Sequence, residues 1–174
     1  MKIINSASFI VNVIIAFSIG TITYGEIMNQ RNADALEDFM EQKQCIAMNI
    51  YHEARGDSKL GMKAVAFVTL NRVQSEQYPD TPCDVVYQAR LDGNGNPKRN
   101  QCQFSWFCDG RSDDPKDKVL FQLADSLAYE VMAEYGEVED PTDGAIMYHA
   151  SYVKPYWAKE YEKTVRIDTH IFYK

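Results

Sequence analysis

The sequence has few basic residues and no cluster of them. Its 18 Lys and Arg residues are outnumbered by 25 Asp and Glu residues, the formal net charge is −7, and the longest basic run is Lys98-Arg99. A nucleic-acid-binding surface requires a basic stripe along one face. The composition therefore predicts no nucleic-acid partner, and the acidic balance mainly indicates solubility.

Metal-binding patterns are incomplete as well. The stretch "HEARG", residues 52–56, begins like the zinc motif H-E-x-x-H, but Gly56 stands where the second histidine is needed one helical turn later. The four cysteines form no C-x-x-C unit. We therefore expect neither a metal nor another cofactor. A metal site built from His52, His149 and His170 is the alternative, because these three could converge in the fold.

Glycine and proline are scarce, with 9 and 6 residues in 174, and no internal repeat or low-complexity segment is visible. Such a chain is typical of one globular domain. Apolar residues at helical spacing predict helices over 45–55, 59–76 and 115–135. Residues 145–153 and 164–173 are β-rich with partial alternation, and each is expected to form one strand. In the second, Val165, Ile167, Thr169 and Ile171 would face one side, and Arg166, Asp168, His170 and Phe172 the other. The expected fold class is α+β, mainly helical, with a small C-terminal β-sheet.

The predicted helix boundaries come from local stop and start signals. Gly56 is expected to end the first helix in the left-handed conformation, and Gly136 to follow the last one. Asp114 is the expected N-cap of that last helix, with Pro115 at its first position. Residues 78–114 show little periodicity, and so long a connection within a domain is usually functional.

The first 25 residues differ from the rest of the chain. No charge lies between Lys2 and Glu26, and the segment is apolar. A positive start followed by an apolar core resembles an export signal, and about 17–20 apolar residues lie near the lower limit for spanning a bilayer. Residues 1–25 are predicted to be a signal peptide or weak membrane anchor, with transient membrane association through 8–25; a buried N-terminal helix is the alternative. Residues 26–43 are predicted to be a linker and lead-in helix.

The even number of cysteines agrees with export. In an oxidising compartment the four would form two disulfides, for which three pairings exist. Cys102 and Cys108 bracket the short loop "QFSWF" and are the preferred pair, which leaves Cys45 with Cys83. In a reducing compartment all four could be free.

Glu53 is the strongest candidate for a catalytic group. It lies within one turn of a helix C-terminus, where the macrodipole disfavours negative charge, and its neighbours Ile50 and Val65 are apolar. Both factors raise the pKa of a carboxyl and keep it protonated, as the acid that cleaves a glycosidic bond must be. The alternative is a surface glutamate paired with Arg55 or Lys59.

Two further stretches combine aromatic and polar side chains. "CQFSWFCDG", residues 102–110, and "MYHASYVKPYW", residues 147–157, could bind sugars through hydrogen bonds and flat aromatic faces, but such residues also build ordinary cores. Both interpretations stay open. The candidates are Gln103, Phe104, Ser105, Trp106, Phe107, Tyr148, His149, Tyr152, Tyr156 and Trp157.

In order along the chain, "NIYHEARGD", "AVAFVTLNRV", "YPDTPCDVVYQ", "CQFSWFCDG", "YHASYVKPYWA" and "THIFYK" resemble the SleB-type cell-wall hydrolases. The resemblance covers residues 44–174, which we therefore expect to be the catalytic domain. It implies a lysozyme-like, lytic-transglycosylase-like fold that acts on the glycan strands of peptidoglycan. The implied acid is Glu53. The implied substrate-binding residues are Gln103, Phe104, Ser105, Tyr148 and His149.

The mechanism depends on whether a second carboxylate is present. A hydrolase needs one about 5 Å or 6.5–9.5 Å from the acid. Asp57 is near in sequence but is expected to cap the next turn or face solvent, and Asp109 is the other option. We therefore expect a lytic transglycosylase that cuts between N-acetylmuramic acid and N-acetylglucosamine, with Glu53 as acid and then base.

Alternatives remain at the level of function and biology. A hydrolytic muramidase with a second carboxylate would leave different products, and a peptidoglycan-binding module without catalysis would use the same aromatic residues. The expected location is the periplasm or cell envelope, with a possible tether through the N-terminal segment. A monomer is assumed. Both an endolysin and a wall-remodelling enzyme fit the sequence.

Overall fold

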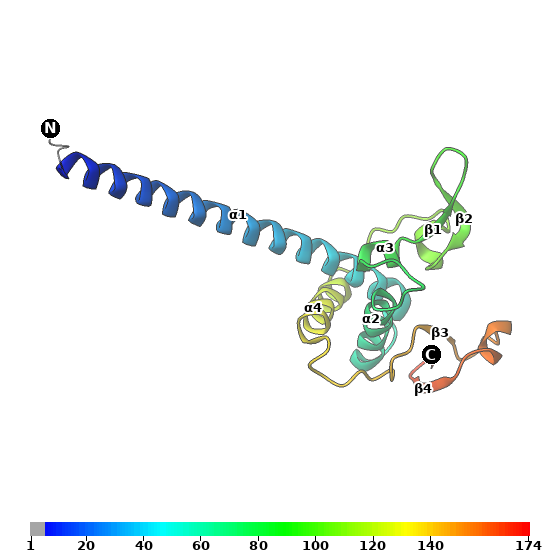
Figure 1. Cartoon of the computed structure of the whole chain (residues 1–174). Helices are drawn as coiled ribbons and strands as arrows, with labels where there is room; N and C mark the ends of the chain where they lie inside the picture. The colour runs from blue at the N-terminus through cyan, green and yellow to red at the C-terminus, as the bar shows by residue number, and fades with distance from the viewer. Residues whose placement is uncertain (1–5) are drawn as a thin grey trace. The chain divides into compact units, whose positions relative to one another are not determined.

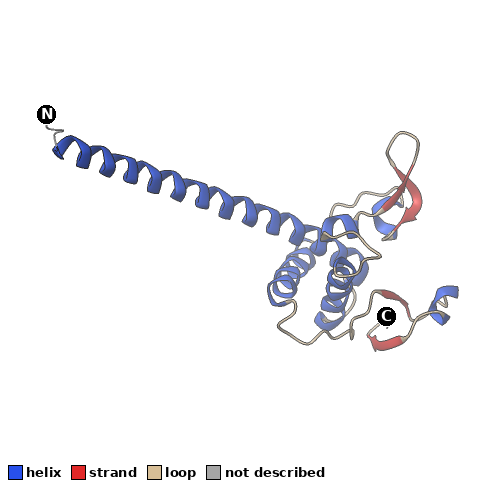
Figure 2. Cartoon of the chain, viewed as in Figure 1, coloured by secondary structure: helices blue, strands red, loops and turns tan. Residues whose placement is uncertain are grey.

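The structure is a computed structural model that describes residues 6–174, with side chains described from Tyr24 onward. It divides into two compact units, residues 1–40 and residues 41–174. About half of the described chain is helical, and the strands are short (Figures 1 and 2). The longer helices are α1 (Ser6–Ala54), α2 (Lys59–Val73) and α4 (Lys118–Glu134); the short ones are α3 (Pro82–Val86), η1 (Ser105–Cys108) and η2 (Tyr156–Lys159). The strands are β1 (Ala89–Leu91), β2 (Pro97–Cys102), β3 (Met147–Ala150), β4 (Lys163–Ile167) and β5 (His170–Tyr173).

The described part of the first unit is helical throughout. Residues 26–43, expected to be a linker and lead-in helix, are helical throughout as part of α1, because they carry good helix formers and neither glycine nor proline. Residues 1–25 are the predicted signal or anchor segment. Residues 1–5 lie outside the described structure, and side chains are not described before residue 24. Within the described residues, no helix is long and apolar enough to cross a membrane.

Three helices form the main core of the second unit. The last turns of α1, one face of α2 and one face of α4 pack together, and α2 and α4 lie side by side (Figure 1). This burial accounts for the apolar periodicity of all three segments. The largest contributors are Ile46, Ile50, Tyr51, Met62, Val65, Phe67, Leu70, Leu127 and Val131.

A small antiparallel sheet covers the other face of α2, where Ala64 and Val68 meet Ile167 and Phe172. Its strand order is β3-β5-β4. The prediction of one strand over 164–173 was wrong, because the chain turns at residues 168–169 to form the β4–β5 hairpin. Asp168 takes φ 47° in this turn, and the predicted alternation of faces therefore breaks there.

The predicted long connection, residues 78–114, is not structureless. It contains α3, the β1–β2 hairpin, which projects from the helices, and η1 (Figures 1 and 2). Both preferred disulfides are confirmed: Cys45–Cys83 ties α3 to α1, and Cys102–Cys108 closes the loop around η1. Short local elements of this kind have too few residues to leave a periodic signal.

Two predicted helix boundaries were wrong. The N-cap of α4 is Asp117, whose carboxylate accepts from the N–H groups of Val119 and Leu120. Asp114 lies ahead of the helix, because the Tyr51 hydroxyl accepts from the backbone N–H of residues 116 and 117 and holds that segment out of it. α1 ends at Ala54 without a left-handed Gly56, whereas Gly136 after α4 has the expected positive φ, 87°.

Asn49 joins three elements inside the second unit. Its side chain is fully buried, its Nδ2 donates to Thr69 of α2 at 3.2 Å, and its Oδ1 accepts from the indole N–H of Trp106 in η1 at 3.2 Å. The Thr69 hydroxyl in turn donates to the carbonyl of Val65. The loop closed by the second disulfide is thereby fixed to the helical core.

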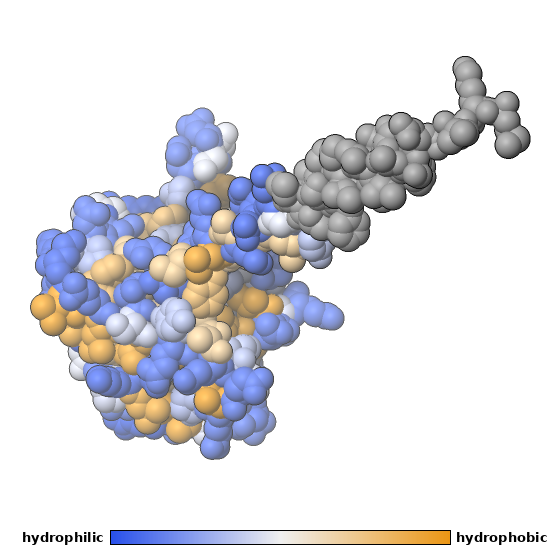
Figure 3. Space-filling view, turned by 90° about the vertical axis from the view of Figure 1, so that its left-hand side faces the viewer, coloured by the Kyte–Doolittle hydropathy of each residue, from blue (hydrophilic) through white to orange (hydrophobic). Residues whose placement is uncertain are grey.

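Figure 3 shows one face of the molecule. On this face apolar side chains are interspersed with hydrophilic ones over the second unit. Scattered exposed apolar residues are normal on a folded domain, so the face suggests no particular function.

We predict that Gly61→Ala destabilises the protein, although alanine normally favours a helix by about 1 kcal/mol. A Cβ at Gly61 would lie 2.5 Å from Asp168 Oδ2 and 2.8 Å from Asp57 Cβ. Since Asp57 Cβ cannot move without its backbone, overpacking should dominate, at about 1–3 kcal/mol. Urea unfolding measures the effect. The control is Gly56→Ala, whose Cβ meets nothing within 4 Å, and an equal stability change in both variants would contradict the packing explanation.

Candidate active site

Glu53 faces a pocket of about 290 Å³. The helices α1 and α2, strand β3, the disulfide loop and η2 all contribute to its wall. Glu53 is the one carboxylate among the described residues that line it. The lining residues are Glu53, Arg72, Cys102, Gln103, Phe104, Ser105, Met147, Tyr148 and Trp157.

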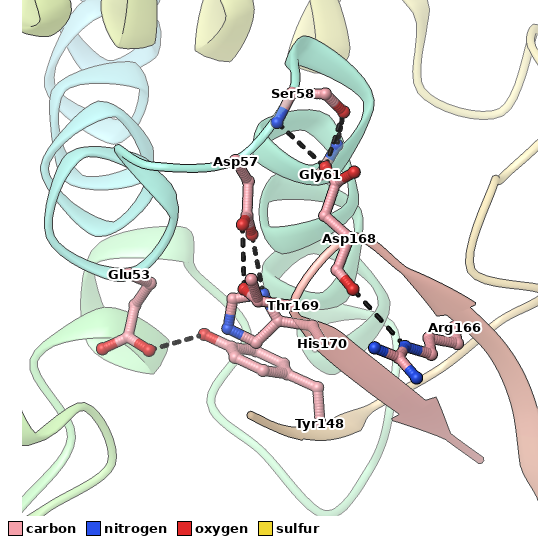
Figure 4. A network of polar contacts seen from close by, with 9 residues as sticks. All are labelled: Glu53, Asp57, Ser58, Gly61, Tyr148, Arg166, Asp168, Thr169 and His170. Carbon is pink, nitrogen blue, oxygen red and sulfur yellow. Dashed lines mark hydrogen bonds and ion pairs between the residues drawn. The ribbon is translucent and has the colours of Figure 1, made fainter. Parts of the chain in front are cut away.

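The Glu53 carboxyl is held by Tyr148 of β3, whose hydroxyl donates to Glu53 Oε2 at 3.1 Å (Figure 4). Burial raises the pKa of Glu53 above its usual value of 4.5. The hydrogen bond from Tyr148 and the charges of His170, Arg72 and His52 act in the opposite direction and favour the carboxylate. The predicted direction of the shift is confirmed. The site thus combines a carboxyl whose pKa is raised by burial with groups able to stabilise its anion.

Arg72 supplies a buried positive charge to this pocket. Only 3% of the residue is exposed, and its Nε donates to the carbonyl of Ile146 at 2.7 Å. Its guanidinium carbon lies 5.2 Å from the ring centres of both Tyr78 and Phe104, a cation–π arrangement. Burial lowers the pKa of Arg72, and the Glu53 carboxylate is among the groups that raise it. Among the described residues, the buried Nη1 atom has no hydrogen-bond partner.

Asp57, four residues after Glu53, is buried rather than facing solvent as expected. Its carboxylate accepts from the Thr169 hydroxyl at 2.8 Å and lies 2.9 Å from Nδ1 of His170 (Figure 4). It does not cap α2; the N-cap is Ser58. The hairpin turn between β4 and β5 is therefore joined to the turn that follows Glu53.

Of the five predicted substrate-binding residues, the structure brings four to Glu53: Gln103, Phe104, Ser105 and Tyr148 line the pocket with it. Ser105 is exposed, whereas Phe104 is only 4% exposed and packs against Arg72. His149 is not among the lining residues. Its Nε2 lies 2.9 Å from the Tyr173 hydroxyl, and its ring packs against Tyr173 and Trp157.

The histidines of the alternative metal site lie in separate environments. His52 stacks on Trp106 and contacts the Asp113 carbonyl, His149 contacts Tyr173, and His170 contacts Asp57. Among the described residues, no group of three His, Cys, Asp or Glu side chains gathers as a metal site would require.

Trp106 and Asp109 belong to a second pocket, of about 420 Å³, bordered by residues 51 and 52 of α1 and by residue 55 just after it. Trp106 is 8% exposed and stacks on His52, so most of its surface is part of the core. Asp109 does not line the Glu53 pocket. Neither residue therefore contributes to the wall of the Glu53 pocket.

Comparison with known proteins identifies the family. The family described as Cell Wall Hydrolase matches residues 56–173, more than half of the chain. The chain is a member of the cell wall hydrolase family. The resemblance seen in the sequence is confirmed, although the matched range begins three residues after Glu53, so the family match does not test the role of this residue.

Solved structures of this family have the same fold. The catalytic domain of the germination-specific lytic transglycosylase SleB from Bacillus anthracis is 27% identical, with a TM-score of 0.58, over 76% of this chain and 93% of that one. The catalytic domain of Bacillus cereus SleB is 26% identical, with a TM-score of 0.55, over 76% and 89%. The expected mainly helical α+β, lysozyme-like fold is confirmed.

Curated relatives in the family are longer proteins. The spore cortex-lytic enzymes of Halalkalibacterium halodurans and Bacillus cereus are each 27% identical, over 130 and 132 residues. The match covers 74% and 75% of this chain but 33% and 43% of those proteins. The chain therefore matches less than half the length of these relatives.

Sequence reasoning missed Arg72, Asp57 and His170 as parts of the site. Arg72 belongs to "NRV" at the end of a helix with few polar residues, and an arginine in such a helix is the signal that could have indicated a buried charge. His170 and Asp57 lie 113 residues apart and approach only through the β4–β5 turn. No local signal could have paired them.

We predict that Glu53→Gln raises the free energy of unfolding relative to the wild type, and that the gain is larger at about pH 7 than at about pH 4. The folded state of the wild type holds the Glu53 proton more tightly than the unfolded chain, so its stability falls as pH rises above 4.5 towards the raised pKa. Glutamine is neutral throughout and still accepts from Tyr148. Denaturant unfolding of both proteins at the two pH values measures the difference; a difference independent of pH would show that burial does not penalise the ionised acid.

Proposed function

We propose that this chain cleaves the glycan strands of peptidoglycan between N-acetylmuramic acid and N-acetylglucosamine, as a lytic transglycosylase. The observation that carries the proposal is a single carboxyl, Glu53, whose pKa is raised in a pocket of sugar-binding character. Membership of the cell wall hydrolase family and likeness to the SleB lytic transglycosylase domain support it.

Glu53 first acts as a general acid. Its raised pKa keeps a proton available for the glycosidic oxygen, which must be protonated as the bond to the muramic acid breaks. The carboxylate that results is stabilised by the Tyr148 hydroxyl and by the positive charge of Arg72. An environment that supports both protonation states suits a residue that must exchange its proton twice.

Glu53 then acts as a general base. It takes the proton from the 6-hydroxyl of the muramic acid, whose oxygen closes a 1,6-anhydro ring on the anomeric carbon. The nucleophile belongs to the substrate itself, so no bound water has to be activated. Gln103 and Ser105 line the same pocket and offer an amide and a hydroxyl to the N-acetyl group or sugar hydroxyls.

The one-carboxylate route is favoured over hydrolysis by the surroundings of the other acids. A retaining or inverting hydrolase requires a second carboxylate facing the sugar. Asp57 is buried and its two oxygens are engaged by Thr169 and His170, while Asp109 lines the other pocket. A hydrolytic muramidase would need one of them to be redirected.

The protein is proposed to act outside the cytoplasm, in the periplasm or cell envelope. Two disulfides suit an oxidising compartment, and an N-terminal export signal or anchor in residues 1–25 would deliver the chain there. Residues 44–174 would be the catalytic domain, preceded by the lead-in segment 26–43. Both lysis of a host by a bacteriophage and remodelling of a bacterial wall fit this activity.

We predict that Glu53→Gln lowers the rate of wall clearing by about 10²–10⁴-fold, because glutamine cannot donate or accept the proton. Turbidity of purified cell walls measures the rate, and mass spectrometry of the products distinguishes 1,6-anhydro ends from reducing ends. Glu134→Gln, on the exposed end of α4, is the control and should retain full activity.

Three outcomes would contradict the proposal. Activity retained in Glu53→Gln would remove this residue from the mechanism. Reducing ends would identify a hydrolase, and sedimentation of the protein with walls without soluble products would identify a binding module.

A further inference from the structure

The Asp57–His170 pair lies outside the pocket that contains Glu53, yet it is buried beside it. The side chains of Asp57 and His170 are only 4% and 9% exposed. Because a carboxylate can only accept, we assign the ring proton to Nδ1 of His170. This N–H donates a hydrogen bond of 2.9 Å to Asp57. The Thr169 hydroxyl donates to the other carboxylate oxygen and fixes the plane of the acid. The orientation of the imidazole ring is therefore determined by Asp57.

The imidazole in turn borders Tyr148. The two rings meet edge to face, with centres 5.1 Å apart and planes at 89°, and both pack against Phe172. Strand pairing places them on neighbouring strands, since Tyr148 faces Phe172 in the β3–β5 register and His170 lies two residues earlier on β5. The Tyr148 ring cannot tilt towards β5 while His170 stays in place.

These contacts form a closed ring. Asp57 follows Glu53 after three intervening residues, Asp57 binds His170, His170 packs on Tyr148, and the Tyr148 hydroxyl returns to Glu53 (Figure 4). The turn that follows the acid thus carries Asp57, which orients His170 beside Tyr148, the partner of that acid.

We propose that Asp57 and His170 are positioning residues for the reaction: they fix the Tyr148 ring, and Tyr148 fixes the Glu53 carboxyl in the pocket. The proposal rests on the proposed function of Glu53. Neither residue lines the described pocket, so neither is expected to contact the sugar.

A separate contact attaches the β4–β5 hairpin to the helices. Asp168, in the same turn, accepts from the backbone N–H of Ser58 at 2.9 Å and from its hydroxyl at 2.6 Å. This contact is exposed and anchors the turn to the start of α2 without touching the His170 or Tyr148 ring (Figure 4). Removing this contact is a matched control, because it loosens the hairpin but leaves the contacts among Glu53, Asp57, His170 and Tyr148 intact.

A double-mutant cycle with His170→Phe and Tyr148→Phe tests the proposal. Each single variant should lower kcat on soluble glycan strands by about tenfold to a hundredfold, with KM nearly unchanged, because a misplaced acid is costly while sugar contacts remain. If His170 acts through Tyr148, adding His170→Phe to Tyr148→Phe should cost less than about twofold more. Losses that multiply in the double variant would overturn the proposal.

Two further variants separate positioning from stability. Asp168→Asn should lower Tm and leave kcat unchanged; an equal loss of kcat would reduce Asp57 and His170 to a structural role. Asp57→Asn replaces His170→Phe in the cycle if the latter does not fold. Added to Tyr148→Phe, Asp57→Asn should also lower kcat by less than about twofold.

The pKa of Glu53, measured by carbon-detected NMR, gives a readout that does not depend on wall cleavage. The groups that face Glu53 are His52 on α1, Arg72 on α2, Tyr148 on β3 and His170 on β5. Since the Tyr148 hydrogen bond and the His170 charge both lower the pKa of Glu53, His170→Phe should raise it. An unchanged pKa would overturn the proposal even in an active enzyme, whereas a raised pKa in a protein that does not cleave walls would contradict the proposed function alone.

Discussion

The hydrogen bond between Tyr148 and Glu53 is the contact on which the site depends. It joins residues 95 positions apart, one at the end of a helix and one on a strand, and it holds a carboxyl whose pKa is raised by burial. Without a donor at this distance the ionised acid would lose its main partner inside a poorly hydrated space. Burial acts in the opposite direction and favours the protonated acid. The proposed reaction depends on the balance of these two effects, because it uses Glu53 first as an acid and then as a base.

The rest of the fold can be understood as support for that contact. The helices α2 and α4 hold the end of α1 in place, because all three share a continuous apolar core. The β3-β5-β4 sheet packs on the opposite face of α2 and brings Tyr148 to the acid. The disulfide Cys102–Cys108 keeps the third wall of the pocket, residues 103–105, in a compact loop. Arg72 connects these parts, since it is on α2, binds the carbonyl before β3 and packs on Phe104.

The sequence predicted what local chemistry determines. Periodicity located α2, α4 and the C-terminal end of α1, cysteine spacing gave both disulfides, and the position of Glu53 at a helix end gave the direction of its pKa shift. Failures occurred where distant residues decide the outcome. Tyr51 moves the start of α4 to Asp117, and contacts with Ser58 accompany the turn at Asp168 that divides a single predicted strand. Arg72 stayed unnoticed because its buried partners, the Ile146 carbonyl and two aromatic rings, come from other segments.

Asn49 shows how narrow the choice of side chain can be in such a core. Its amide accepts from the indole of Trp106 and donates to Thr69, whose hydroxyl proton is already given to the Val65 carbonyl. Aspartate has the same shape but two acceptor oxygens, so it would face the Thr69 oxygen without a proton between them and bring an ionised group into a dry interior. Deamidation, a common form of chemical ageing, would therefore loosen the η1 loop from the helices.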